Sequence, residues 1–156
     1  MTTKSLKRFL ITANKAGYVT GNERSWKKEK DKSTTITFKQ GKWSMNDNFF
    51  GGEPYGGRLA VFYDHKPVWL MIYYGWVETK ANPDEVYKVL RAALAKMPNA
   101  SPFRGPKKLL SGQFKYLNSW AGKVTRFSGT EIILKGKTEI YRASYMGGTV
   151  DQRKAL

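Results

Sequence analysis

The sequence contains no cysteine and only one histidine. The absence of cysteine excludes disulfides, thiolate metal sites and cysteine nucleophiles. His65 lies in a predicted turn, and no residues around it suggest a metal site or a catalytic triad. The carboxylates near predicted strand ends have no recurring spacing, so we expect neither a metal nor a cofactor; these carboxylates are Asp47, Glu53, Asp64 and Glu131.

Long hydrophobic runs are also absent. The longest run, Val68 to Val77, has ten residues, about half the length that a membrane-spanning helix needs. The apolar patch from Phe9 to Ala13 is too short for the core of a secretory signal. We therefore predict a cytoplasmic protein with no membrane partner.

Acidic residues are scarce, with 12 Asp and Glu against 28 Lys and Arg, which gives a net charge of +16. Such an excess attracts polyanions through long-range steering and the release of counterions. A requirement for solubility would give the same total without any nucleic acid. The charge therefore indicates a class of partner and says nothing about the fold.

Periodic patterns predict helices and strands in one α+β domain, residues 1–156. Apolar residues recur at helical spacing between Ser5 and Ala16, and a second helix begins at Pro83 after the N-cap Asn82 and ends before Pro98. Alternating runs predict hairpins over residues 34–46 and 58–77. Four further β-type runs follow; these are residues 113–120, 123–127, 131–135 and 138–146.

The two halves of the chain resemble each other at an offset of 72 residues. Tyr73 and Gly75 align with Tyr145 and Gly147, and the order of helix and hairpins is the same in both halves. We therefore predict two αββββ units related by a pseudo-two-fold axis, residues 1–80 and 81–150, followed by a tail, 151–156. In each unit one helix would pack on its own antiparallel sheet. The alternative is that any two hairpins with aromatic strands look alike.

The strand that contains Val68 to Tyr74 is apolar on both faces, and its counterpart, which contains Ile140 to Met146, is not. A strand that is apolar on both faces is expected to be covered on both. The cover could be the basic loop, the other half of the chain or a second subunit, so a homodimer through this sheet face is one prediction. A ligand pocket between the halves is another, near Trp69, Tyr73, Tyr141 and Tyr145.

Basic residues interleaved with aromatic residues predict a surface for nucleic acid. Lysine and arginine side chains follow phosphates, and aromatic rings stack on bases. Three loops and one strand residue have this character. The residues that we expect to contact nucleic acid are Arg24, Trp26, Lys27, Lys28, Lys30, Arg58, Arg104, Lys107, Lys108, Lys123 and Arg126.

Several motifs together resemble a family of uncharacterised bacterial and archaeal domains, sometimes fused behind an XRE-type helix-turn-helix. They are "YGG", "PVWLMIYYG", "PFRGP", "FSGTEI" and the final "YMGG". The resemblance runs from "FLITANKAGY" to "YMGGTV" and implies a domain that senses a ligand or mediates pairing. Arg58-Leu59 replaces two expected acids, and Met146 replaces an expected histidine, so roles that depend on those residues are in doubt here.

Three functions are consistent with these features. The first is a non-enzymatic domain that binds a polyanion, most readily nucleic acid. The second is a sensor of a small molecule or nucleotide, with its pocket between the two halves. The third is an enzyme that uses carboxylates such as Glu53 and Glu131. The sequence designates no catalytic residue.

Overall fold

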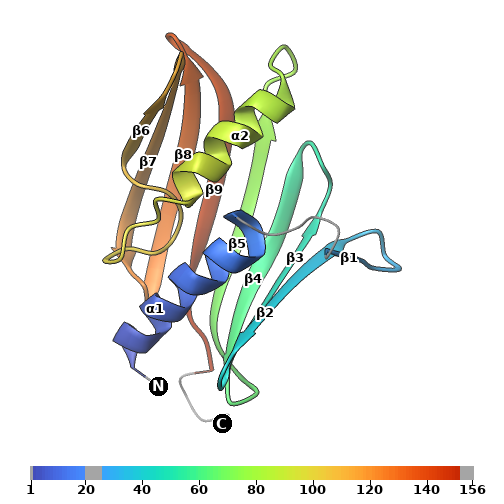
Figure 1. Cartoon of the computed structure of the whole chain (residues 1–156), viewed down its shortest axis with the longest axis vertical. Coiled ribbons are helices and arrows are strands. Elements are labelled where there is room, and N and C mark those ends of the chain that lie inside the picture. Colours follow the sequence, from blue (N-terminus) through green and yellow to red (C-terminus); the bar gives the residue numbers. More distant parts are fainter. Residues whose placement is uncertain (1, 20–25, 152–156) are drawn as a thin grey trace.

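The computed structural model describes residues 2–19 and 26–151. Two α-helices lie on one face of a single antiparallel sheet (Figure 1). Helix α1 spans Thr3–Asn14 and continues into a short π-helical segment, η1, Lys15–Val19. Helix α2 spans Pro83–Leu94. Among the described residues, no helix is long and apolar enough to cross a bilayer.

Side chains at both N-termini explain where the helices begin. Thr2 and Ser5 form a reciprocal capping box at α1, so the helix starts two residues before the predicted Ser5. At α2, Asn82 Oδ1 accepts a hydrogen bond from the backbone N–H of Asp84 at 2.9 Å, and Pro83 takes the first helical position as predicted. Both predicted helices are confirmed.

The strands form one sheet of nine, in the order β1-β2-β3-β4-β5-β9-β8-β7-β6. Every neighbouring pair is antiparallel. The bounds are β1 Lys27–Lys28, β2 Thr34–Gln40, β3 Trp43–Phe50, β4 Tyr55–Tyr63, β5 Lys66–Val77, β6 Lys108–Ser111, β7 Phe114–Lys123, β8 Arg126–Lys135 and β9 Thr138–Thr149.

The prediction of two αββββ units, each with its own sheet and helix, is wrong. Strand β5 pairs with β9 from Trp69↔Thr149 to Val77↔Tyr141, and this ladder joins all the strands into one continuous sheet. The physical reason is the position of β5. Its long apolar run belongs to a central strand, which is hydrogen-bonded on one side to β4 and on the other to β9, so it joins the two halves instead of ending one of them.

The face of β5 that points away from the helices is not covered by the described chain. Ile72 is 46% exposed and Tyr74 53% exposed, and Met146 on the neighbouring strand is 53% exposed. Neither the other half of the chain nor the described part of the basic loop, residues 26–33, covers this face. The predicted homodimer through it stays a prediction.

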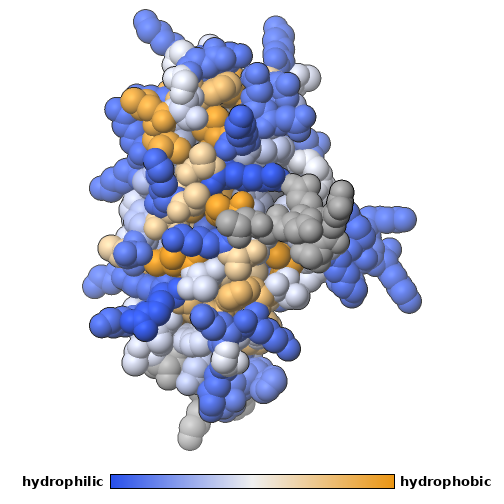
Figure 2. Space-filling model, viewed as in Figure 1, coloured by the Kyte–Doolittle hydropathy of each residue, from blue (hydrophilic) through white to orange (hydrophobic). Residues whose placement is uncertain are grey.

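The core lies between the helices and the sheet, in two adjoining clusters. Helix α1 packs with β2 to β5 around Trp69, which is 1% exposed. The indole N–H of Trp69 donates a hydrogen bond to the carbonyl of Val124 at 2.8 Å. Helix α2 packs with the strands around Tyr116 and Tyr141. Figure 2 shows hydrophilic side chains around the edge of this face and hydrophobic side chains reaching the surface nearer its middle.

Candidate functional site: a cavity beneath the helices

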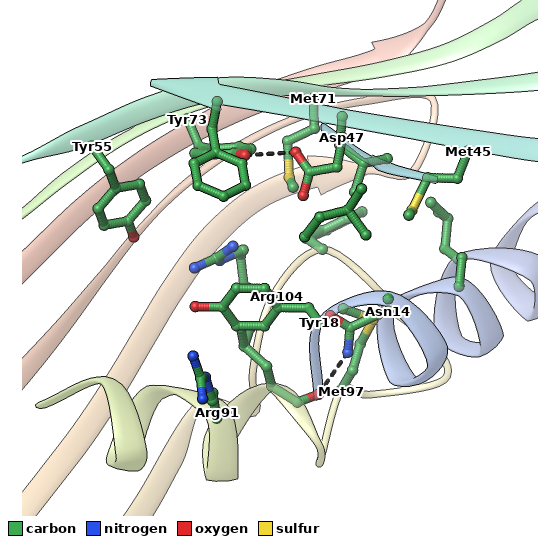
Figure 3. A pocket seen from close by; sticks show the side chains of 18 of the residues that line it. Asn14, Tyr18, Met45, Asp47, Tyr55, Met71, Tyr73, Arg91, Met97 and Arg104 are labelled. Atoms are coloured by element: carbon green, nitrogen blue, oxygen red, sulfur yellow. Dashed lines mark hydrogen bonds between the residues drawn. The ribbon is translucent and has the colours of Figure 1, made fainter. Parts of the chain in front are cut away.

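A cavity of about 350 Å³ lies between the two helices and the sheet. Its roof is made by α1, η1, α2 and the segment 97–104, and its floor, which is uppermost in Figure 3, by strands β2 to β5. Ligand pockets in proteins usually occupy a few hundred Å³ and combine an apolar lining with a few placed polar groups. The size of this cavity suits a small organic molecule.

Most of the cavity wall is apolar. Alternation in the strands points every second side chain toward the helices, and the helices contribute residues from their buried stripes. The apolar and aromatic lining residues include Leu10, Ala13, Trp26, Ile36, Met45, Phe49, Leu59, Trp69, Met71, Leu94, Met97 and Phe103.

Asp47 is a carboxylate on this apolar floor. It follows Met45 and precedes Phe49 on the same face of β3. Its Oδ1 accepts a hydrogen bond from the hydroxyl of Tyr73 at 2.6 Å (Figure 3). Burial raises the pKa of Asp47 to about 6, against the opposing effects of the Tyr73 hydrogen bond and the charge of Arg104. Among the described residues, no cation lies within ion-pair distance of Asp47.

Arg104 projects into the cavity from the segment before β6, and Glu131 holds it in place. Glu131 is fully buried on β8, and its Oε1 accepts from Arg104 Nε at 3.0 Å. The hydroxyls of Tyr116 and Tyr141 also donate to this carboxylate, at 2.6 and 2.9 Å. Burial is the largest single influence and lowers the pKa of Arg104, but the charge and hydrogen bond of Glu131 together with the neighbouring Tyr55 and Tyr141 outweigh it, so the net effect is a raised pKa. The guanidinium therefore stays charged and fixed in orientation.

Tyr73 lies between the two charged groups. The guanidinium carbon of Arg104 is 6.0 Å from the centroid of the Tyr73 ring, and the hydroxyl of the same tyrosine bonds to Asp47. Burial, and then the neighbouring Asp47, raise the pKa of Tyr73 well above its usual value. The cavity thus presents a carboxylate on its floor and a guanidinium from its roof, both close to one neutral phenol.

Tyr18 and Arg91 contribute to the opposite side from η1 and α2. The Arg91 guanidinium carbon is 5.9 Å from the Tyr18 ring centroid, and Tyr18 stacks on Trp26 with centroids 6.2 Å apart. The indole nitrogen of Trp26 is buried and has no hydrogen-bond partner among the described residues. Asn14 Nδ2 donates to the carbonyl of Leu94 at 3.0 Å and ties α1 to the end of α2 (Figure 3).

The predicted pocket residues divide into two groups. Trp69 and Tyr73 line the cavity. Tyr141 and Tyr145 lie in the neighbouring hydrogen-bond network, where the hydroxyl of Tyr141 is 2.6 Å from that of Tyr55 and the hydroxyl of Tyr145 donates to Asn118 at 2.7 Å. Sequence reasoning missed the role of Asp47 at this site. The signal was an acid inside an alternating apolar stripe, Trp43-x-Met45-x-Asp47-x-Phe49.

The two carboxylates considered for enzymatic chemistry, Glu131 and Glu53, both accept hydrogen bonds within the fold. Glu131 belongs to the Arg104 network. Glu53 accepts hydrogen bonds from the hydroxyl of Tyr87 and the backbone N–H of Val77. Among the described residues, no group of three or more His, Asp or Glu side chains is placed to hold a metal ion.

The residues predicted to bind nucleic acid do not form one surface. Lys27 and Lys28 make up β1 at one edge of the sheet, with the exposed Lys30 in the turn that follows, and both Trp26 and Lys28 line the cavity. Lys107 and Lys108 lie at the opposite edge, next to β7.

The remaining members of this set lie elsewhere. Lys123 and Arg126 face each other at the exposed turn between β7 and β8. Arg58 is exposed on β4, while the side chain of Arg104 is only 12% exposed. Arg24 lies outside the described residues.

Comparison with known proteins gives one match. A family model described as a domain of unknown function, DUF5680, matches residues 47–150. The expected resemblance to an uncharacterised domain family is thereby confirmed, while fusion to a helix-turn-helix is not shown. No curated protein and no solved structure matches the chain.

Proposed function

Because the chain belongs to the DUF5680 family of domains of unknown function, we propose its function from the cavity: it binds a small organic molecule beneath its helices. The bound molecule has an apolar body, which contacts the lining of Met, Leu and aromatic residues, and a polar end, which meets Asp47 and Arg104. The protein acts as a binding domain that responds to its ligand.

Asp47 is the observation that carries this proposal. A carboxylate placed in apolar surroundings costs stability unless it is paired or hydrogen-bonded. The Tyr73 hydroxyl supplies one hydrogen bond, and burial raises the pKa of the group to about 6. Residues that cost stability are tolerated at functional sites, and hydrogen bonds from a ligand would stabilise this carboxylate.

The polyanion-binding hypothesis stays a prediction, supported by the net charge of +16. Most of the basic residues on which it depends lie at opposite edges of the sheet, whereas the cavity residues converge on one space. The geometry therefore favours ligand binding as the main function. An association with helix-turn-helix proteins is a further part of the hypothesis, and it fits a ligand-sensing role.

A fragment screen by thermal shift tests the proposal. Saturation to ten times Kd stabilises a protein by about 1.4 kcal/mol, which raises the Tm of a domain of this size by about 3–6 °C. We expect some fragments to produce this shift in the wild-type protein. Ala13→Leu, which fills the cavity from α1, should abolish it, because Ala13 is 1% exposed and lines the cavity.

The matched control is Ala92→Leu, which adds the same side chain to an exposed position of α2. This variant should respond to the fragments as the wild type does. Fragments that stabilise all three proteins equally would bind elsewhere and would contradict the proposal. A screen in which no fragment stabilises the wild type would also contradict it.

A further inference from the structure

The cavity holds polar groups whose hydrogen-bonding capacity the fold does not use in full. An ionised carboxylate accepts through two oxygens, and Tyr73 occupies Oδ1 of Asp47. A guanidinium has five N–H donors, and two of those of Arg104 go to Glu131 Oε1, one from Nε and one from Nη2. The ligand therefore meets an acceptor at Asp47 and donors at Arg104.

The signs of these groups argue against a charged ligand. An anionic group would approach the Asp47 carboxylate, which has no ion-pair partner among the described residues. A cationic group could pair with Asp47 but would lie close to Arg104, in a lining that also holds Lys28 and Arg91. An uncharged group with a donor beside an acceptor complements both Asp47 and Arg104.

The rings around Asp47 favour a planar body. Phe49 lies two residues along β3 and contacts Trp26 edge-on at 6.0 Å between centroids. Tyr73, the hydrogen-bond partner of Asp47, lies 6.0 Å from Tyr55. Aromatic side chains bind flat ring systems by stacked and edge-on contacts, and a volume of about 350 Å³ admits a two-ring molecule.

We infer that the ligand is a planar, uncharged heterocycle whose edge carries an N–H beside a C=O, as in a cyclic amide or a nucleobase. The N–H donates to Asp47, and the C=O accepts from Arg104. This inference rests on the proposed function and names the chemical class of its ligand.

Four probes with the same two-ring size test the inference by isothermal titration at pH 7.5. They are isoquinolin-1(2H)-one, its N-methyl derivative, 2-naphthoate and 2-naphthylmethylamine. A hydrogen bond to a charged acceptor contributes about 1.5–3 kcal/mol, so isoquinolinone should bind at least about tenfold more tightly than the N-methyl derivative. Its affinity should exceed the affinities of 2-naphthoate and 2-naphthylmethylamine by a similar factor.

The Asp47→Leu variant removes the acceptor and keeps a similar volume. A carboxylate in apolar surroundings without an ion-pair partner costs stability, so we expect this variant to fold, which its Tm checks. The preference for isoquinolinone over its N-methyl derivative should fall below about threefold, since the charged acceptor is gone. Asp84→Leu, at an exposed position of α2, should keep the full preference.

The outcomes separate this inference from the proposed function. Equal binding of isoquinolinone and its N-methyl derivative, or tighter binding of the acid or the amine, would overturn the inference while the cavity remained a binding site. The inference is also overturned, and the cavity remains a binding site, if no probe binds but the fragment screen yields cavity ligands. If neither the probes nor the fragments bind, both proposals are overturned.

Discussion

The ionisation of Asp47 should link the stability of this fold to pH. Burial raises its folded-state pKa to about 6, above the value of about 3.9 in an unfolded chain. Between these values the folded protein binds more protons than the unfolded chain, so this group lowers stability as the pH rises from 4 to 6. Above pH 6 the full cost is present, and below pH 4 it is absent.

Asp47→Asn should therefore stabilise the protein at neutral pH. A shift of about two pKa units corresponds to about 3 kcal/mol at most, and contact with the open cavity reduces it, so we expect about 1–3 kcal/mol at pH 7.5. Near pH 4 the variant and the wild type should be equally stable. Urea unfolding at both pH values measures this difference. Asp64→Asn, in an exposed turn, is the control and should change little at either pH.

Glu131 should be far more important for stability than a surface carboxylate. It is fully buried and accepts hydrogen bonds from Arg104, Tyr116 and Tyr141. Glu131→Gln would leave the charge of Arg104 uncompensated, and breaking a buried pair in this way costs about 3–5 kcal/mol.

The comparison for Glu131 is Glu139→Gln, which removes the partly exposed pair with Arg142. Exposed pairs contribute less than about 1 kcal/mol, so this variant should lose little stability. The free energy of unfolding in urea distinguishes the two. A loss for Glu131→Gln as small as that for Glu139→Gln would show that the buried network is not needed for stability.

At the scale of helices and strands, local patterns predicted the elements and missed how they assemble. The helical stripes and caps indicated α1 and α2, and turn residues indicated the β2–β3 and β4–β5 hairpins. The pairing of β5 with β9 joins residues about 70 positions apart, and no periodicity reports such a contact. The short edge strand β6 was also missed, because its four residues follow a loop rich in proline and lysine.

Gly129 shows why one predicted turn was wrong. The separate β-type runs predicted over residues 123–127 and 131–135 imply a turn at this glycine, but Gly129 lies in the middle of β8, paired with Tyr145 on β9 and Trp120 on β7. A Cβ atom at this position would lie 2.3 Å from Cζ and Oη of Tyr145. The residue is glycine because the tyrosine ring crosses the strand where a side chain would stand.

Gly129→Ala should consequently destabilise the protein. The added methyl group would force Tyr145 away from Asn118, and overpacking of this kind costs about 1–3 kcal/mol. Gly52→Ala is the control, because nothing lies within 4 Å of a Cβ there. Thermal unfolding should show a clear loss for the first variant and almost none for the second. Equal Tm values would mean that Tyr145 moves aside without cost.

The cavity was only partly predictable for a related reason. Its aromatic residues stand out in the sequence, and two of the residues predicted to line a pocket, Trp69 and Tyr73, lie in the cavity wall. The pocket was expected between two halves of the chain, whereas the cavity lies between the helix layer and the sheet. Arg104 was assigned to a basic surface because its buried partner, Glu131, is 27 residues away in the chain.

At the scale of the whole molecule, the net charge of +16 and the cavity need not serve the same partner. Lys27 and Lys28 lie at one edge of the sheet and Lys107 and Lys108 at the other. Charges spread in this way attract a polyanion from several sides without defining one groove. They favour binding to nucleic acid that depends on phosphate contacts and little on base sequence.

Retardation of labelled DNA and RNA at increasing salt tests this prediction. The logarithm of the affinity should fall with the logarithm of the salt concentration, with a slope of about −0.7 to −0.9 per phosphate contacted. The double variants Lys27→Glu/Lys28→Glu and Lys123→Glu/Arg126→Glu should each reduce that slope by about two contacts. Asp47→Leu should leave the slope unchanged, because Asp47 faces the cavity between the helices and the sheet. No retardation at low salt would contradict polyanion binding, and the cavity would then remain the one binding function proposed for the chain.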